Sequence, residues 1–210
     1  MIRMIIYDFD GTIADSLRVM LEAYNRQAVK RGFKLVTENN APSLRAQAPR
    51  EALRELGIKL YQVPGLIYRV LKDVRPEVVN LAPHTGMKEW LYRARELGYR
   101  QAILTSNLED SVRGFLLNND LNLFDHLYCG SGAFGKTRSL KKLLKDTQLT
   151  PREVVYVGDE IRDIEATRRV GISIICVGWG YNTREILESH HPHAVINRPE
   201  ELLPAVERLR

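Results

Sequence analysis

Four groups of polar residues occur at places in the sequence where they could share one reaction. Each follows an apolar run or precedes a helical pattern, and the groups are Asp8-Phe9-Asp10-Gly11-Thr12, Thr105-Ser106-Asn107, Lys136, and Gly158-Asp159-Glu160 with Asp163. Carboxylates are ligands for hard divalent cations, and hydroxyl and ammonium groups bind phosphate oxygens. A carboxylate can attack a phosphoryl group only if cations screen the repulsion between them. The residue types therefore predict phosphoryl transfer assisted by a cation.

The elements that must position these groups are short apolar strands alternating with helices. β-branched, apolar runs occupy residues 2–7, 101–105, 154–157, 173–177 and 194–196, and helical patterns such as 87–97 precede the later runs. This alternation is typical of an α/β fold with a parallel sheet. Ligands of such sheets bind beyond the carboxyl ends of the strands, which is where the polar groups lie. A capping-box pattern at 150–153 also predicts a short helical turn before the third run.

Residues 16–80 break the alternation, because they contain consecutive helical patterns separated by Asn, Pro and Gly. We therefore predict a doubly wound, Rossmann-like α/β core formed by residues 1–15 and 81–210, with an inserted helical cap domain at 16–80. Such a cap would close over the site, exclude water and contact the leaving group. Arg45, predicted in a loop at 42–45, is a candidate for binding an anionic group of the substrate; a solvated loop arginine is the alternative.

In these motifs the chain resembles the haloacid dehalogenase superfamily of phosphohydrolases. That family has a hydrophobic strand followed by DxDGT, then Ser or Thr, then Lys, then GDxxxD, and DFDGT, LTSN, FGK and GDEIRD reproduce this order here. The resemblance covers almost the whole chain. A helical cap directly after DFDGTIADS is similar to the branch containing phosphoglycolate phosphatases and β-phosphoglucomutases.

The resemblance implies a Mg²⁺-dependent phosphatase acting on a small phosphomonoester. Asp8 would be the nucleophile that forms an aspartyl-phosphate. Asp10 would protonate the leaving oxygen and then activate water. Asp8, Asp10 through its backbone carbonyl, and Asp159 would hold the Mg²⁺, and Asp163 would orient a metal-bound water or Lys136.

Phosphate binding is implied for the remaining motif residues. Gly11 gives the loop after the first strand its conformational freedom. Thr105, Ser106 and the amide of Asn107 would hold phosphate oxygens, and either hydroxyl could be the principal one. Lys136 would add a positive charge beside the nucleophile; a solvated lysine at a helix start is the alternative interpretation.

Three other functions compete with the phosphatase. Gly130–Thr137 fits the GxxxxGK[ST] pattern of P-loop nucleotide enzymes, but that interpretation gives the DFDGT segment no role. A catalytically silent module with the same fold could bind a phosphorylated ligand. A phosphomutase would pass the phosphoryl group to a sugar instead of water.

Composition and net charge restrict the classes of binding partner. The chain has 210 residues, 44% of them hydrophobic and 27% charged, and a net charge of +5. This modest positive charge favours a small phosphorylated metabolite and is too diffuse for nucleic acid. No apolar run reaches the roughly 18 residues of a membrane span. Cys129 and Cys176, both in strand-like runs, are expected to be reduced and buried, so we expect a cytoplasmic protein.

Three further patterns are interpreted as structural. The histidines of segment 190–193 lack a second cluster of soft ligands, which disfavours a metal site. The Trp-Gly-Tyr segment at 179–181 is expected to be a loop packed on the sheet. Arg162, Arg168 and Arg169 are expected on a solvated helix face. The sequence leaves the oligomeric state undetermined.

Overall fold

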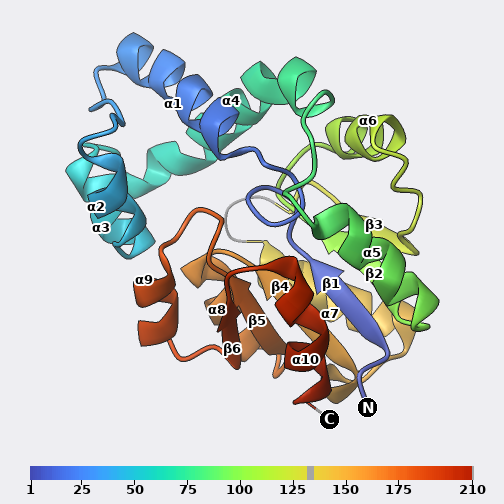
Figure 1. Cartoon of the computed structure of the whole chain (residues 1–210). Coiled ribbons are helices and arrows are strands. Elements are labelled where there is room, and N and C mark those ends of the chain that lie inside the picture. The colour runs from blue at the N-terminus through green and yellow to red at the C-terminus, as the bar shows by residue number, and fades with distance from the viewer. Residues whose placement is uncertain (132–134, 210) are drawn as a thin grey trace.

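The core of the protein is a six-stranded sheet in which every strand is parallel to its neighbours (Figure 1). The computed structural model describes residues 1–131 and 135–209. The strands are β1 (Met4–Tyr7), β2 (Arg100–Leu104), β3 (His126–Tyr128), β4 (Val154–Gly158), β5 (Ser173–Val177) and β6 (Ala194–Ile196), in the order β3-β2-β1-β4-β5-β6. This is the order of a doubly wound sheet: β2 and β3 are added on one side of β1, and β4, β5 and β6 on the other. The predicted fold class is confirmed.

Helices cover both faces of the sheet. The core helices are α5 (Met87–Glu96), α6 (Glu109–Asn118), α7 (Lys136–Thr147), α8 (Ile161–Arg168), α9 (Arg184–Ser189) and α10 (Leu202–Glu207). Ile5 and Tyr7 of β1 point into a cluster with α5, α6 and α10, whereas Met4 and Ile6 point into a cluster with α7, α8 and α9. Because both faces are covered, the central strands are continuously apolar.

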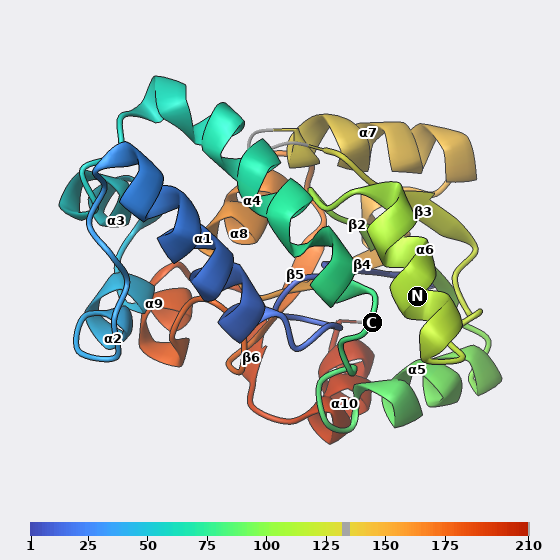
Figure 2. The same cartoon turned by 90° about the horizontal axis from the view of Figure 1, so that it is seen from above.

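Four helices form the cap above the carboxyl ends of the strands. They are α1 (Leu17–Arg31), α2 (Ala41–Arg45), α3 (Pro49–Glu55) and α4 (Val63–Val78). Figure 2 shows α1 and α4 side by side, with α2 and α3 to the left of α1. The cap has an apolar cluster of its own, formed by Leu44, Leu56, Ile58, Val63 and Leu66. The helical content predicted for this segment is confirmed, and its division from the core at residues 15/16 and 80/81 stays a prediction.

The two chain segments that join cap and core run beside each other. The amide of Asp15 donates to the carbonyl of Ala82 at 3.2 Å, and the amide of His84 donates to the carbonyl of Ile13 at 2.7 Å. Ala14 and Pro83 form an antiparallel bridge between these bonds. The cap is therefore attached through a short two-stranded connection that begins directly after the DFDGT segment.

Several local predictions are confirmed and others need correction. The turn before β4 is a 3₁₀ helix at Pro151–Glu153 with the predicted capping box. Strand β3 was not predicted, and β1 starts at Met4 instead of Ile2. Arg45 ends a short helix, α2, and does not lie in a loop, because the segment after Asn40 closes one turn of backbone hydrogen bonds.

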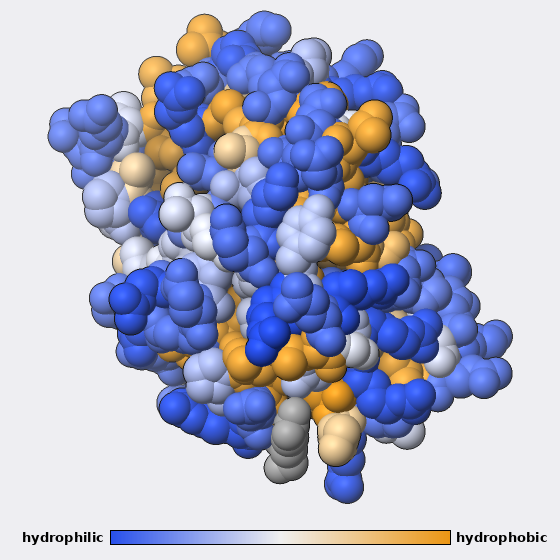
Figure 3. All heavy atoms as spheres, turned by 45° about the vertical axis from the view of Figure 1, so that its right-hand side comes forward, coloured by the Kyte–Doolittle hydropathy of each residue, from blue (hydrophilic) through white to orange (hydrophobic). Residues whose placement is uncertain are grey.

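The cysteines and the surface also differ in part from the sequence interpretation. Cys176 is a buried free thiol in β5, whereas Cys129 is a half-buried free thiol one residue beyond β3. Figure 3 shows a face dominated by hydrophilic side chains, with apolar ones gathered in patches. Among the described residues, no helix has the length and apolar character needed to cross a membrane.

Candidate active site

Three aspartates meet at the carboxyl ends of the two central strands. Asp8 follows β1, Asp159 follows β4, and Asp163 lies in the first turn of α8. Their exposed fractions are 4%, 0% and 0%, and one carboxylate oxygen from each lies within 4.8 Å of the others. Neighbouring parallel strands end at the same edge of the sheet, so the fold itself brings together residues 150 positions apart.

Lys136 binds two of these aspartates. It is the first residue of α7, and its Nζ donates to Oδ1 of Asp163 at 2.5 Å and to Oδ2 of Asp8. The ring of Tyr156 lies 5.8 Å from the same ammonium group. The side chain is 6% exposed, which excludes the interpretation of Lys136 as a solvated lysine.

The cluster carries more negative than positive charge. Three buried carboxylates face one ammonium group. Burial raises the pKa of Asp8 to about 7 even though Lys136 lowers it, and burial also holds the pKa of Asp159 well above its usual value. Asp163 and Asp8 outweigh the effect of burial on Lys136 and keep its pKa above the usual value. A divalent cation would compensate these charges, so the donor set fits Mg²⁺.

Asp10 lies beside this cluster and is held by Asn107. The side-chain amide of Asn107 donates to both carboxylate oxygens of Asp10, at 3.2 and 3.0 Å. Burial raises the pKa of Asp10 to about 6, against the lowering effect of Asn107. A carboxyl group with a pKa near neutrality can both give and accept a proton.

The two candidate phosphate-binding hydroxyls, those of Thr105 and Ser106, differ in how far they are buried. Thr105 is buried, and its Oγ1 accepts a hydrogen bond from the backbone N–H of Asn107 at 3.0 Å. Ser106 is only half-buried and lines the cavity that also contains Asp8 and Asp10. The geometry favours Ser106 as the hydroxyl that meets a ligand, with Thr105 shaping the turn below it.

Asp159 is held by residues that were not among the predicted site residues. The hydroxyl of Thr12 donates to its Oδ1 and the amide of Tyr181 donates to its Oδ2, both at 2.7 Å. A Cβ on Gly180 would overlap the Asp159 side chain, and a Cβ on Gly11, whose φ is +75°, would lie 2.7 Å from the Tyr181 ring. These glycines let two loops close around one carboxylate.

The end of α2 is attached to the loop that follows β5. The guanidinium group of Arg45 donates to the carbonyls of Gly180 at 2.7 Å and Tyr181 at 2.9 Å. The Arg45 carbonyl accepts hydrogen bonds from the Asn182 side chain at 3.0 Å and the Thr183 amide at 3.2 Å. We call these four bonds the cap–core contact. The predicted binding of a substrate anion by Arg45 stays a prediction.

Arg162 does not lie on a solvated face, contrary to the sequence interpretation. Its guanidinium group donates to both carboxylate oxygens of Glu160, at 2.8 and 2.5 Å, and the pair is partly buried. The prediction failed because Glu160 and Arg162 face the cap, which adds a second wall beside α8. Arg168 and Arg169 are exposed, as expected.

The interpretation of residues 179–181 as a loop packed on the sheet fits the geometry for Trp179. Trp179 packs against the core, where its indole stacks on His84 and donates to the carbonyl of Thr12. Tyr181, two residues later, lines the cavity that also contains Asp8 and Asp10. Among residues 1–131 and 135–209, the aspartate cluster is the one group arranged to hold a metal, and it includes none of the histidines.

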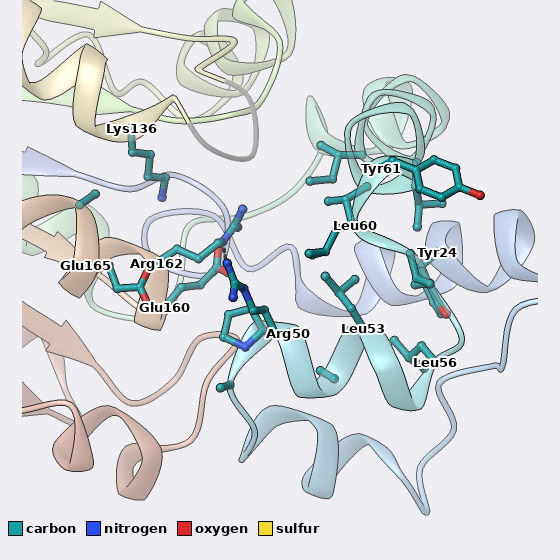
Figure 4. Close-up of a pocket in the computed structure, with 18 of the residues that line it drawn as sticks. Tyr24, Arg50, Leu53, Leu56, Leu60, Tyr61, Lys136, Glu160, Arg162 and Glu165 are labelled. Atoms are coloured by element: carbon teal, nitrogen blue, oxygen red, sulfur yellow. Dashed lines mark hydrogen bonds and ion pairs between the residues drawn. The ribbon is translucent and has the colours of Figure 1, made fainter.

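Two adjoining cavities lie between cap and core. The inner cavity, about 350 Å³, contains Asp8, Asp10 and Ser106. The outer cavity, about 780 Å³, contains Lys136 and is lined by apolar cap residues. The Glu160–Arg162 pair lines both. Figure 4 shows Arg50 of the cap pointing toward this pair across the outer cavity.

Residues 5–177 match the family described as haloacid dehalogenase-like hydrolase. The chain belongs to this family. As a haloacid dehalogenase-like hydrolase, it is an enzyme.

Relatives agree with this assignment over nearly the full length. The chain is 33% identical to a phosphoglycolate phosphatase of Synechococcus elongatus over 206 residues, which cover 98% of this chain and 97% of that protein. A haloacid dehalogenase-like protein from Streptococcus pneumoniae superposes with a TM-score of 0.79 at 18% identity, covering 98% of both chains. A β-phosphoglucomutase-like structure from Thermotoga maritima gives a TM-score of 0.68 at 24% identity, covering all of both chains.

Family membership also explains the residues that suggested a nucleotide-binding loop. Lys136 binds Asp8 and Asp163, as expected for a lysine of this family's site. The remainder of Gly130–Thr137 includes residues 132–134, which lie outside the described residues. The P-loop alternative is therefore not needed to account for Lys136 or Asp159.

Proposed function

We propose that this protein is a Mg²⁺-dependent phosphatase that hydrolyses a small phosphomonoester through an aspartyl-phosphate on Asp8. The observation that carries the proposal is the position of Asp8, which contacts the ammonium group of Lys136 and lines the inner cavity. A phosphate in this cavity would meet a nucleophile, a cation and the hydroxyl of Ser106 together.

Asp8 and Asp10 would act in two steps. In the first, a carboxylate oxygen of Asp8 forms a bond to phosphorus while the ester P–O bond breaks, and Asp10 gives its proton to the departing alcohol oxygen. In the second, Asp10 takes a proton from water, whose oxygen attacks phosphorus and releases phosphate from Asp8. The raised pKa of Asp10, about 6, suits both transfers.

Asp8, Asp159 and the backbone carbonyl of Asp10 would hold the Mg²⁺, which supplies charge compensation for the incoming phosphate. Asp163 accepts a hydrogen bond from Lys136 at 2.5 Å and so holds this lysine beside the nucleophile. Thr12 and the amide of Tyr181 keep both oxygens of Asp159 oriented.

Phosphoglycolate is the first substrate to test, because the relative that is 33% identical is named for it. The same relative favours water over a sugar as the final acceptor, so we place hydrolysis ahead of phosphomutase transfer. Reduced cysteines remain consistent with the cytoplasmic location expected from the sequence.

Replacing the nucleophile tests the proposal. Asp8→Asn should lower Mg²⁺-dependent phosphate release from phosphoglycolate and other small esters by about a thousandfold or more. Asp120→Asn, at an exposed position outside the site, is the control and should keep wild-type turnover. Phosphate release at the wild-type rate from Asp8→Asn would defeat the assignment.

A further inference from the structure

We propose that the leaving group of the substrate carries an apolar body, an alkyl chain or an aromatic ring, which lies against the cap wall of the outer cavity. This inference rests on the proposed phosphatase function and specifies the substrate class of the same site. It predicts a better substrate than a two-carbon acid phosphate.

The position of the outer cavity supports this role. Lys136, which contacts Asp8, lines the outer cavity, and the Glu160–Arg162 pair lines both cavities. The two cavities also share Tyr24, Leu56, Leu66 and Ile67, so a leaving group too large for the inner cavity can extend into the outer one. A volume of about 780 Å³ is in the range that accommodates drug-sized ligands, about 300 to 1,000 Å³. A glycolate leaving group would fill little of it.

The cap wall of this cavity is apolar apart from Arg50. Its apolar side chains come from α1, from α3 and the turn after it, and from the start of α4, and they are Tyr24, Leu53, Leu56, Ile58, Leu60, Val63, Leu66 and Ile67. Figure 4 shows Leu53 and Leu60 on the side of the cavity opposite Glu160 and Arg162. Leu60 is 51% exposed although it stands at a cavity wall. Covering such a surface with an apolar ligand is favourable.

The core wall is charged, but its charges are already compensated. Glu160 and Arg162 form a two-point ion pair at 2.8 and 2.5 Å. Because the two charges of this ion pair neutralise each other, the pair does not require a charged group on the ligand. Arg50 of the cap points toward this pair, and the apolar part of the cap wall lies on the opposite side. That apolar part is therefore the surface that distinguishes one leaving group from another.

A series of primary alkyl phosphates tests the inference. Ethyl, butyl, hexyl and 3-phenylpropyl phosphate have leaving groups of similar basicity, so differences in kcat/KM report contacts of the apolar body. We expect kcat/KM to rise from ethyl to hexyl, by up to about fourfold for each methylene that becomes fully buried. Phosphoglycolate is measured in parallel with Mg²⁺ present.

Matched leucine variants locate the contact. Leu60→Ser should flatten the dependence on chain length and leave kcat/KM for ethyl phosphate unchanged. Leu35→Ser, at a cap leucine that is 42% exposed and lines neither cavity, should keep the wild-type dependence. Both positions are exposed, so neither change removes a core contact.

The outcomes separate the two proposals. Release of phosphate from phosphoglycolate and ethyl phosphate with no gain for longer chains would overturn the apolar leaving group and leave the phosphatase function intact. A gain that survives in Leu60→Ser and disappears in Leu35→Ser would also overturn it. No phosphate release from any ester would refute the phosphatase function, and the inference would fall with it.

Discussion

At the scale of single residues, the feature that stands out is the orientation of the Asp159 carboxylate. Asp159 receives hydrogen bonds from Thr12 and from the amide of Tyr181, so both of its oxygens are fixed before any cation arrives. Loss of a group that orients a metal ligand typically lowers metal affinity by about 10- to 100-fold. The residues around Asp159 should therefore matter for Mg²⁺ even though they would not touch it.

Gly180→Ala tests this dependence. The added Cβ would overlap the Asp159 side chain, so that carboxylate must move. We expect the Mg²⁺ concentration for half-maximal activity to rise by about tenfold or more. Gly65→Ala is the matched control, because its Cβ would meet no atom within 4 Å, and it should leave the Mg²⁺ requirement unchanged. An unaltered requirement in Gly180→Ala would contradict this role of the glycine.

At the scale of elements, the cap–core contact fixes the position of α2 against the loop that follows β5. Arg45→Ala removes two hydrogen bonds that the guanidinium group donates to Gly180 and Tyr181. Since these bonds hold the cap and not a substrate group, we expect kcat/KM to fall by about tenfold for every phosphomonoester alike. Steady-state kinetics with ethyl phosphate and phosphoglycolate measure this.

Arg54→Ala is the control for this prediction, because Arg54 is an exposed cap arginine that lines neither cavity. It should behave as the wild type. If Arg45→Ala raised KM only for phosphoglycolate, which has a second anion, Arg45 would instead bind substrate, as the sequence first suggested.

The strands also show which parts of the fold and the site can be predicted from the sequence. The apolar runs of β1 and β4 are visible because both faces are buried, and the rule that ligands bind at strand ends then places Asp8 and Asp159 together. Strand β3, a half-buried edge strand with the sequence His-Leu-Tyr, was not among the predicted strands of the sheet, although the run around Cys129 was recognised as strand-like. Sequence patterns describe local structure well where burial is strong.

Long-range contacts explain the remaining differences. Arg162 looks like a solvated helical residue until the cap supplies the other wall of its cavity. Tyr181 follows β5, so the strand-end rule could have suggested it, but its amide reaches Asp159 only through the path of the loop. The position of Ser106 at the wall of the inner cavity likewise depends on a turn in which the Thr105 hydroxyl is buried and accepts a hydrogen bond from the Asn107 amide. None of these positions follows from spacing alone.

At the scale of the whole molecule, the buried carboxylates link stability to pH. The folded protein holds the pKa of Asp8 at about 7 and that of Asp10 at about 6, both above the usual value of 3.8. Such groups favour the folded state while protonated, and this contribution is lost as pH rises through the folded pKa. We expect the Tm of metal-free protein to fall between about pH 5 and pH 8.

Thermal melts with chelator and with Mg²⁺ check this prediction. A cation binds ionised carboxylates, so Mg²⁺ should raise the Tm more at pH 8 than at pH 5. Asp8→Asn removes one titrating group and should reduce the pH dependence in chelator. A Tm that rises from pH 5 to pH 8 without metal would contradict the argument.

The paired segments at the base of the cap have one more consequence. Because Asp15 and Ala82 are joined by a hydrogen bond, the insert leaves the core and returns to it at almost the same point. A shorter bridge could span that gap at little entropic cost. An insert of another length or fold could therefore be attached at the same point and leave the strand order of the core unchanged.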